Sequence, residues 1–284
     1  EAKEATGSMG DDTPIAILSD KYRPLSHFFR QKFSQVTNPP IDSIREQSRM
    51  SLKTRFGNLR DVLDSNSYQE SVFVMDSPVV TNSIFNKMLK FGKEELVIID
   101  CSFSTNENAL KENIKRIQGE AEAAVLSGKQ HIVLTDKYTD ETRVSIPMIL
   151  ATAAVHSFLT RKGIRSFISL HVQSAECLDT HYFAVLIGVG ATTVNPYLAQ
   201  ECIRERHEKG LFKDYTYEEC VERYKKAVDQ GLLKIMAKLG ISVVSAYRGG
   251  FNFEVVGLSR SMVNEYFIGV QSRISGIGLS GVEY

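Results

Sequence analysis

The sequence lacks several features that mark particular classes of protein. It contains no tryptophan, and its four cysteines, Cys101, Cys177, Cys202 and Cys220, are widely spaced, so that none of them forms a Cys-x-x-Cys pair. Zinc ribbons and iron–sulfur ligation therefore have no support in the sequence. Because few and scattered cysteines are typical of reduced thiols, we expect the chain to work in a cytosol-like compartment.

Neither an excess of one charge nor a long hydrophobic run is present. The 34 lysine and arginine residues balance 34 aspartate and glutamate residues, so a broadly cationic surface for nucleic acid or anionic lipid is not expected. No apolar run approaches the roughly 20 residues that a membrane span needs, and the Glu-Ala-Lys-Glu start is unlike a signal peptide. These absences predict a soluble, cytoplasmic protein with neither nucleic-acid nor membrane partners.

Two regions of the chain differ in composition. Residues 1–70 are rich in Asp, Asn, Ser, Arg and Pro and show only a short helical stretch at residues 25–33, which predicts an irregular connecting or interface segment. From residue 71 to residue 284, short apolar runs alternate with helical periods. These runs are apolar on both faces, as in strands that are covered on both sides, and they span residues 72–75, 96–99, 131–134, 167–170, 183–187 and 241–245.

Helix signals separate the apolar runs. The signals are a capping box at Ser104 and Glu107, Pro147 before an apolar helix to Lys162, Asn195 as a cap before Pro196, and a second capping box at Thr216 and Glu219. Alternating strand–helix units predict an α/β fold with a mostly parallel sheet, either layered or an incomplete β/α (TIM-like) barrel. At the end of the chain, alternation around residues 251–255 indicates an antiparallel edge, and the glycine-rich residues 276–281 indicate a flexible connector.

Polar residues beyond the expected strand ends are the first candidates for chemistry, because ligands of α/β folds bind there. They are Asp100, Asp136, His171 with Gln173 and Ser174, and residues 188–193. A catalytic carboxylate pair is one interpretation of the two aspartates, but helix capping is the favoured one.

The remaining histidines and cysteines give no clear site. His171, Glu176, Cys177 and His181 fit no ligand spacing, and His156 is expected to be a hydrogen-bonded core histidine. Because no nucleophile elbow occurs and the glycines at residues 188–191 lack the G-x-G-x-x-G spacing, the residues themselves predict no catalytic group, no bound cofactor and no metal.

Several collinear blocks carry a resemblance to a known family. They are Gly-Ser-Met-Gly-Asp-Asp-Thr-Pro at residues 7–14, Gln-Val-Thr-Asn-Pro-Pro-Ile-Asp at residues 35–42, Val-Asn-Pro-Tyr-Leu-Ala at residues 194–199, Lys-Ile-Met-Ala-Lys-Leu-Gly-Ile-Ser at residues 234–242 and Ser-Ala-Tyr-Arg-Gly-Gly at residues 245–250. From end to end, residues 1–284 resemble the central domain of glutamate synthase large chains.

The resemblance implies one part of a larger enzyme. Such enzymes join a glutaminase domain, this central domain, an FMN-binding barrel and a β-helix; they hydrolyse glutamine, pass ammonia to 2-oxoglutarate and reduce the imine to glutamate. It implies FMN and an iron–sulfur cluster in the full-length enzyme, and a reductase subunit or ferredoxin as electron donor. The piece itself is expected to be inactive and without cofactor, with the glutaminase and FMN-binding domains of the same chain as its partners.

The task of such a domain suggests which side chains matter. Ammonia in water at neutral pH is mostly protonated and no longer nucleophilic, so a shielded passage must join the two active sites. Small neutral hydrogen-bonding groups suit its lining, whereas carboxylates would trap ammonium. The candidates for the passage and domain interface are Thr37, Asn38, Thr54 and Asn58, with Arg45 orienting the turn.

Other interpretations stay open at this stage. Asn38 can simply cap a turn that is stiffened by Pro39 and Pro40, and Arg45 can form a buried ion pair. A self-contained β/α enzyme that binds flavin or phosphate at residues 188–193 and the Asp136 loop is the alternative function. A self-associating scaffold is a third.

Overall fold

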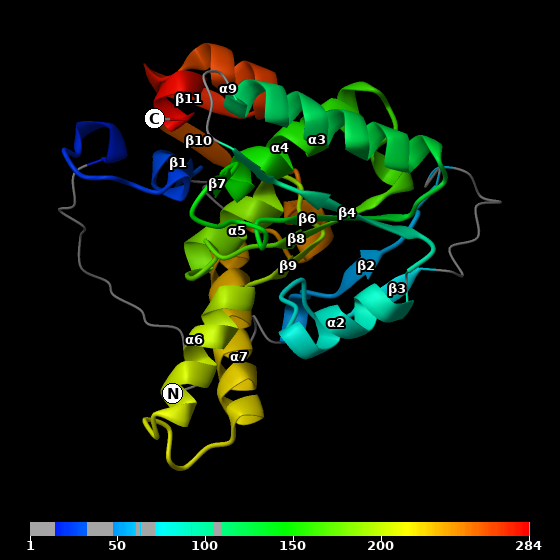
Figure 1. Cartoon of the computed structure of the whole chain (residues 1–284), viewed down its shortest axis with the longest axis vertical. Coiled ribbons are helices and arrows are strands. Elements are labelled where there is room, and N and C mark those ends of the chain that lie inside the picture. Colours follow the sequence, from blue (N-terminus) through cyan, green and yellow to red (C-terminus); the bar gives the residue numbers. More distant parts are fainter. Residues whose placement is uncertain are drawn as a thin grey trace.

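Residues 15–32, 48–60, 63, 72–91, 93–104 and 109–283 are described by a computed structural model. A parallel sheet lies at the centre, with α3 and α4 above it and α2 below it in the view of Figure 1. The strands of this sheet are β4 (Leu96–Asp100), β6 (His131–Thr135), β8 (Ser169–Gln173) and β9 (Thr193–Asn195), in the order β4-β6-β8-β9.

All neighbours in this sheet are parallel, and helices connect them. The predicted α/β class with a mostly parallel sheet is therefore confirmed. Within the described residues the four strands form an open sheet and no closed barrel.

The upper face of the sheet holds the main core. Ile132, Leu134, Leu170 and Val172 point into it and are fully buried. They pack with the helices α3 (Ala109–Leu126), α4 (Met148–Arg161) and α5 (Thr180–Gly188). As predicted, α4 is apolar nearly all round, because it is covered on every side.

The lower face of the sheet is covered by smaller elements. These are the helix α2 (Asn82–Phe91) and an antiparallel pair of short strands, β2 (Thr54–Phe56) and β3 (Phe73–Met75). Val133 on β6 packs there against Val80 and Phe85 in a second, separate apolar cluster.

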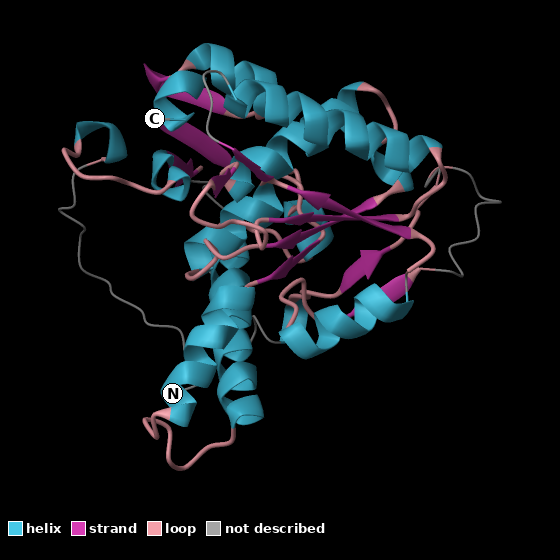
Figure 2. Ribbon diagram, in the orientation of Figure 1, coloured by secondary structure: helices cyan, strands magenta, loops and turns pink. Residues whose placement is uncertain are grey.

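Two long helices form a hairpin that projects from the body of the molecule (Figure 2). They are α6 (Tyr197–Glu208) and α7 (Tyr217–Lys238). The capping box at the start of α7 is confirmed: Glu219 N–H donates to Thr216 Oγ1 over 3.2 Å, and Thr216 N–H donates to Glu219 Oε2 over 2.8 Å.

A three-stranded sheet joins the two ends of the described chain. Its strands are β1 (Phe29–Gln31), β10 (Phe253–Leu258) and β11 (Gln271–Ile277). The antiparallel pairing predicted for β10 is confirmed by its register with β1, but β10 is the middle strand and no edge, because β11 pairs with its other side.

Short elements complete the fold. They are η1 (Ala16–Leu18), η2 (Leu25–Phe28), β5 (Ser102–Ser104), β7 (Arg143–Ser145), η3 (Arg165–Phe167), α8 (Val244–Tyr247), α9 (Arg260–Tyr266) and α10 (Leu279–Glu283). Phe29 in the front segment is fully buried and packs on Phe253 and Phe267, so described parts of residues 1–70 belong to the core. The division of the chain near residue 70 stays a prediction.

Three of the predicted strands are wrong or displaced. Residues 183–187 lie in α5, where the Asp179 side chain caps the helix by accepting from Tyr182 N–H; the run is apolar on all sides because the helix is buried. Residues 165–167 form η3, so β8 begins two residues later than predicted. Residues 241–245 contribute one bridge to Ser51 and then enter α8.

Two predictions about single segments are also wrong. Asn195 does not cap α6; its side-chain amide donates to the carbonyl of Val80 and to Asn82 Oδ1, each over 2.9 Å. The glycine-rich end is no loose connector, because it forms the last part of β11 and α10. The capping box at Ser104 involves Glu107, which lies outside the described residues.

Candidate functional site

Asp136 lies where the parallel strands end, just after β6. Its Oδ2 accepts from Ala175 N–H over 2.8 Å and from Ser174 Oγ over 3.3 Å, while Oδ1 has no hydrogen-bond partner. Asp136 is only 2% exposed, and burial raises its pKa. The favoured capping role is therefore wrong for Asp136, which instead ties the end of β6 to the loop after β8.

A second carboxyl group, that of the exposed residue Glu176, interacts with Asp136. Glu176 Oε2 accepts from the Tyr182 hydroxyl and, over 3.2 Å, from Met148 N–H at the start of α4. Burial raises the pKa of Glu176, and the charge of Asp136 raises it further. The Tyr182 hydroxyl stays protonated, because burial and Glu176 raise its pKa well above the usual value.

Asp100, the other half of the suggested carboxylate pair, has its own partners. Its Oδ1 accepts from both the N–H and the hydroxyl of Ser102, and its Oδ2 forms an ion pair with Arg143 over 2.7 Å. Burial opposes ionisation, but these bonds outweigh it and lower the pKa of Asp100. Ser102 begins β5, so Asp100 caps no helix. With each carboxyl held by different partners, we find no acid–base pair here.

Uncharged polar groups run across the lower face of the sheet. Thr135 Oγ1 donates to Gln173 Oε1 over 2.8 Å, and Gln173 Nε2 donates to Asn195 Oδ1 over 3.1 Å. Asn195 continues the series to Asn82 at the start of α2. This ladder of hydroxyl and amide groups crosses three strands and carries no charge.

A second polar series crosses the same face and was missed by sequence reasoning. His171 lies inside β8, not beyond it, and its imidazole contacts His131 of β6 and Thr193 of β9. The detectable signal was the spacing of polar residues at every second position, as in Ser169, His171 and Gln173 of β8.

Residues 188–193 form no phosphate cradle. The backbone N–H groups of Gly190, Ala191 and Thr192 donate to carbonyls of residues 187, 186 and 170, so they are not free to bind an anion. The carbonyl groups of residues 190–192 accept from the guanidinium groups of Arg165 and Arg248. This loop also precedes β9, whereas Asp136 follows β6, so the two lie at opposite ends of the sheet. The phosphate site of the alternative function is therefore wrong.

The histidines outside the sheet have structural partners. His156 accepts a hydrogen bond from Arg165 Nε over 3.1 Å, which confirms the predicted hydrogen-bonded core histidine. His181 Nε2 donates to the Ser26 carbonyl over 2.9 Å and so links α5 to the front segment. Among the described residues, no group of three or more His, Cys, Asp or Glu side chains is arranged to hold a metal ion.

Two of the five predicted passage residues can be placed. Thr54 begins β2 and is 1% exposed, and its hydroxyl donates to the Leu52 carbonyl over 3.0 Å. Asn58 follows β2; its Oδ1 accepts from Arg60 N–H, and its N–H donates to Gln130 Oε1. Thr37, Asn38 and Arg45 lie outside the described residues. A role of any of the five in a passage stays a prediction.

Comparison with known proteins identifies the family. Residues 1–259 match the family described as "Glutamate synthase central domain". The chain belongs to this family. The glutamate synthase [NADPH] large chain of Azospirillum brasilense is 56% identical over 285 residues, which cover 100% of this chain and 19% of that protein. The [NADPH] large chain of Bacillus subtilis is 39% identical and matches 99% of this chain and 18% of its own length.

The central domain therefore spans about a fifth of the curated relatives that it matches. A ferredoxin-dependent glutamate synthase of Pyropia yezoensis is also 39% identical, over 98% of this chain. Among solved structures, the recombinant flavin-binding domain of baker's yeast flavocytochrome b2 is 14% identical over 69% of this chain and 42% of its own, with a TM-score of 0.40. No helix among the described residues is both long and apolar enough to cross a membrane.

Proposed function

We propose that this chain is the connecting domain of a glutamate synthase. It joins the glutaminase and FMN-binding domains of the complete protein and helps to form the passage for ammonia during glutamate synthesis from glutamine and 2-oxoglutarate. The observation that carries this proposal is the match of the whole chain, at 56% identity, to one fifth of a glutamate synthase large chain.

The chemistry of the described residues supports a connecting role. The two carboxyl groups near the strand ends, those of Asp136 and Glu176, accept hydrogen bonds from hydroxyl and backbone N–H groups. FMN, an iron–sulfur cluster and electron delivery by a reductase subunit or ferredoxin belong, in this proposal, to the other parts of the complete enzyme. We place the enzyme in the cytoplasm.

Substitutions in the complete enzyme test the passage. Replacing Thr37 or Asn38 with tryptophan should block ammonia transfer while glutaminase activity continues, because a bulky side chain narrows the passage without touching the glutaminase site. Thr54→Val removes a hydroxyl group at nearly constant volume, and Asn58→Phe adds bulk nearby. The measurement compares 2-oxoglutarate consumed with glutamine hydrolysed, which are equal amounts in the coupled reaction.

Thr142→Trp is the control for this experiment. Thr142 is exposed in the turn before β7, so its replacement should leave the two amounts equal. If the Thr37 and Asn38 variants also keep them equal, these residues do not line the passage. Restoration of 2-oxoglutarate consumption by added ammonium would show that the synthase site of a blocked variant is intact.

A further inference from the structure

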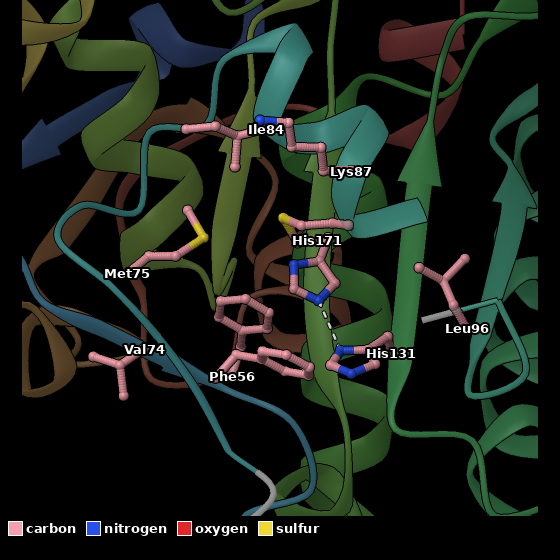
Figure 3. A pocket seen from close by; sticks show the side chains of 10 residues that line it. Phe56, Val74, Met75, Ile84, Lys87, Leu96, His131 and His171 are labelled. Atoms are coloured by element: carbon pink, nitrogen blue, oxygen red, sulfur yellow. Dashed lines mark hydrogen bonds between the residues drawn. The ribbon is translucent and has the colours of Figure 1, made fainter. Parts of the chain in front are cut away.

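A pocket of about 190 Å³ lies between the lower face of the parallel sheet, α2 and the β2–β3 pair (Figure 3). Its walls are mostly apolar and include Phe56, Phe73, Met75, Ile84, Met88 and Leu96. The rings of Phe56 and Phe73 are stacked, with their centroids 5.4 Å apart. Since a cavity of roughly 150 Å³ accepts benzene, this pocket has room for one six-membered ring with a small substituent.

The polar side chains of the pocket lie in two separate places. His131 and His171 belong to β6 and β8 of the sheet. Lys87 belongs to α2 and lies beside Ile84, at the other end of the pocket from His131 (Figure 3). Because Lys87 is exposed, its charge is hydrated. Polar recognition between the apolar walls therefore depends on the two histidines.

The two histidines form a hydrogen-bonded series with Thr193. His131 Nδ1 lies 3.1 Å from His171 Nε2, and His171 Nδ1 lies 2.7 Å from Thr193 Oγ1. Phe56 packs edge-on against both imidazoles, with ring centroids 5.9 and 5.4 Å apart. Burial lowers the pKa of both histidines, so each ring is neutral at neutral pH and carries one N–H group.

The surroundings of Thr193 decide which nitrogen atoms carry the hydrogen. Thr193 is fully buried, and within the described chain His171 is the one side chain that its Oγ1 contacts by a hydrogen bond. The hydroxyl group therefore donates to His171 Nδ1, because its hydrogen has no other acceptor. His171 Nε2–H in turn donates to His131 Nδ1, and His131 carries its own hydrogen on Nε2.

The series thus ends in a donor, His131 Nε2–H, that has no partner among the described residues. Within the same residues, Asp136 Oδ1 is the one fully buried side-chain oxygen or nitrogen without a hydrogen bond, so His131 Nε2 keeps access to open space. This nitrogen lies on the side of the ring that is turned away from His171 (Figure 3). One open donor therefore remains beside largely apolar walls.

We propose that this pocket binds a small uncharged aromatic molecule that carries one hydrogen-bond acceptor, such as a ketone oxygen. The ring packs among the apolar walls, and the acceptor is bonded to His131 Nε2–H. A ligand without an acceptor leaves this donor unpaired when it displaces water. A charged group gains only one neutral donor there, which does not offset the loss of its hydration. The proposal is independent of ammonia transfer.

Fluorine NMR with two probes of similar size tests this proposal in the complete natural chain. 4-Fluoroacetophenone carries the acceptor, and 4-fluoroethylbenzene lacks it. The measure is the ratio of their two affinities divided by the ratio of their water–cyclohexane partition coefficients, which removes the difference in hydrophobicity. We expect saturable binding and a corrected ratio of about ten or more in favour of the ketone, because only the ketone bonds His131.

Substitution of His131 tests the donor itself. His131→Phe keeps a ring of similar size but removes the N–H group, so the corrected ratio should fall to about one while the hydrocarbon still binds. If this variant does not fold, the corrected ratio in the natural chain still decides the question.

Substitutions on α2 show that the probes bind in this pocket. Met88→Trp fills the pocket and should abolish the binding of both probes. Lys90→Trp is the matched control, since it adds the same bulk to α2 at an exposed position that does not line the pocket. Lys87→Met should leave both affinities unchanged, because the Lys87 side chain lies away from His131 (Figure 3).

Three results would overturn the proposal. They are no saturable binding of either probe, a corrected ratio of about one in the natural chain, and unchanged binding of both probes by a folded Met88→Trp variant. Such a failure leaves the proposed connecting function untouched, because no activity enters the measurement.

Discussion

His156 shows at the residue scale how a histidine can be held neutral by its neighbours. Its Nδ1 accepts from Arg165 Nε, and its ring packs against Gly190 and Gly249, where a Cβ atom would lie 2.3 and 3.4 Å from the ring. Burial, together with Arg165 and Arg248, lowers the pKa of His156 to about 3. The folded protein therefore does not protonate this ring in mild acid, whereas the unfolded chain does.

This difference predicts a loss of stability on acidification. Below the unfolded pKa of 6.5 the unfolded state binds a proton that the folded state does not, so the free energy of unfolding falls as the pH falls, by about 2 kcal/mol for His156 at about pH 5. His156→Asn keeps an acceptor for Arg165 but cannot titrate. Urea unfolding at about pH 7.5 and about pH 5 measures how far the free energy of unfolding falls between the two conditions. We expect this fall to be about 2 kcal/mol smaller in the variant than in the natural chain.

A histidine in another part of the fold provides the control. His207 lies in the projecting hairpin, where its ring donates a hydrogen bond to the Tyr215 carbonyl. The His207→Asn substitution should not reduce the loss of stability on acidification as His156→Asn does. If the free energy of unfolding falls by the same amount on acidification in the natural chain and in the His156→Asn variant, the account of His156 is wrong.

Local signals at the residue scale were predictable, and tertiary ones were not. Thr216 and Glu219 bond each other within one turn, so their spacing sufficed to predict a capping box. Asn195 has equally good local signals for a cap, but its amide bonds Asn82, which is 113 residues away in sequence. The contacts of His171 with His131 and Thr193 depend likewise on the strand order, which no local pattern reveals.

At the element scale, α5 and α7 show how close contact overrides helix propensity. Gly231 of α7 faces Thr180 of α5, and a Cβ atom at position 231 would lie 2.5 Å from Thr180 Cγ2. Gly119 of α3 is exposed and has no atom within 4 Å of such a Cβ. The same substitution should therefore act in opposite directions at these two helix positions.

Gly119→Ala should raise the free energy of unfolding by about 0.5–1 kcal/mol, because alanine restricts the unfolded chain and favours the helix. Gly231→Ala should lower it by about 1 kcal/mol or more, since the helices must separate or Thr180 must move. Thermal and urea unfolding measure both. Adding Thr180→Ala should recover part of the loss at position 231; no recovery would show that the contact is not its cause.

Hydrophobic periodicity predicted an element correctly where the pattern of apolar residues was typical of only one kind of secondary structure. The helix α4 was predicted because Pro147 stands directly before a long apolar stretch that reaches Lys162. The α5 segment was mistaken for a strand because a buried helix and a buried strand are both apolar on every side, and only the cap at Asp179 distinguishes them. The start of β8 was misjudged by two residues, which moved His171 from inside the strand to its end.

At the scale of the whole molecule, the chain forms an open α/β sheet whose two faces differ. The upper face is apolar and is covered by long helices. The lower face carries the uncharged ladder from Thr135 to Asn195 and the hydrogen-bonded series from His131 through His171 to Thr193. Asp100 and Asp136, at the ends of neighbouring strands, are held by different partners. We propose that this architecture supports the neighbouring domains of a complete enzyme.

The most direct measurement compares the purified 284-residue chain with the complete enzyme for bound flavin and for turnover of glutamine and 2-oxoglutarate. Circular dichroism first establishes that the separate chain is folded. We expect it to be colourless and inactive, while the complete enzyme is yellow and converts both substrates. Stoichiometric flavin absorbance or glutamate formation by the folded 284-residue chain alone would contradict a connecting role.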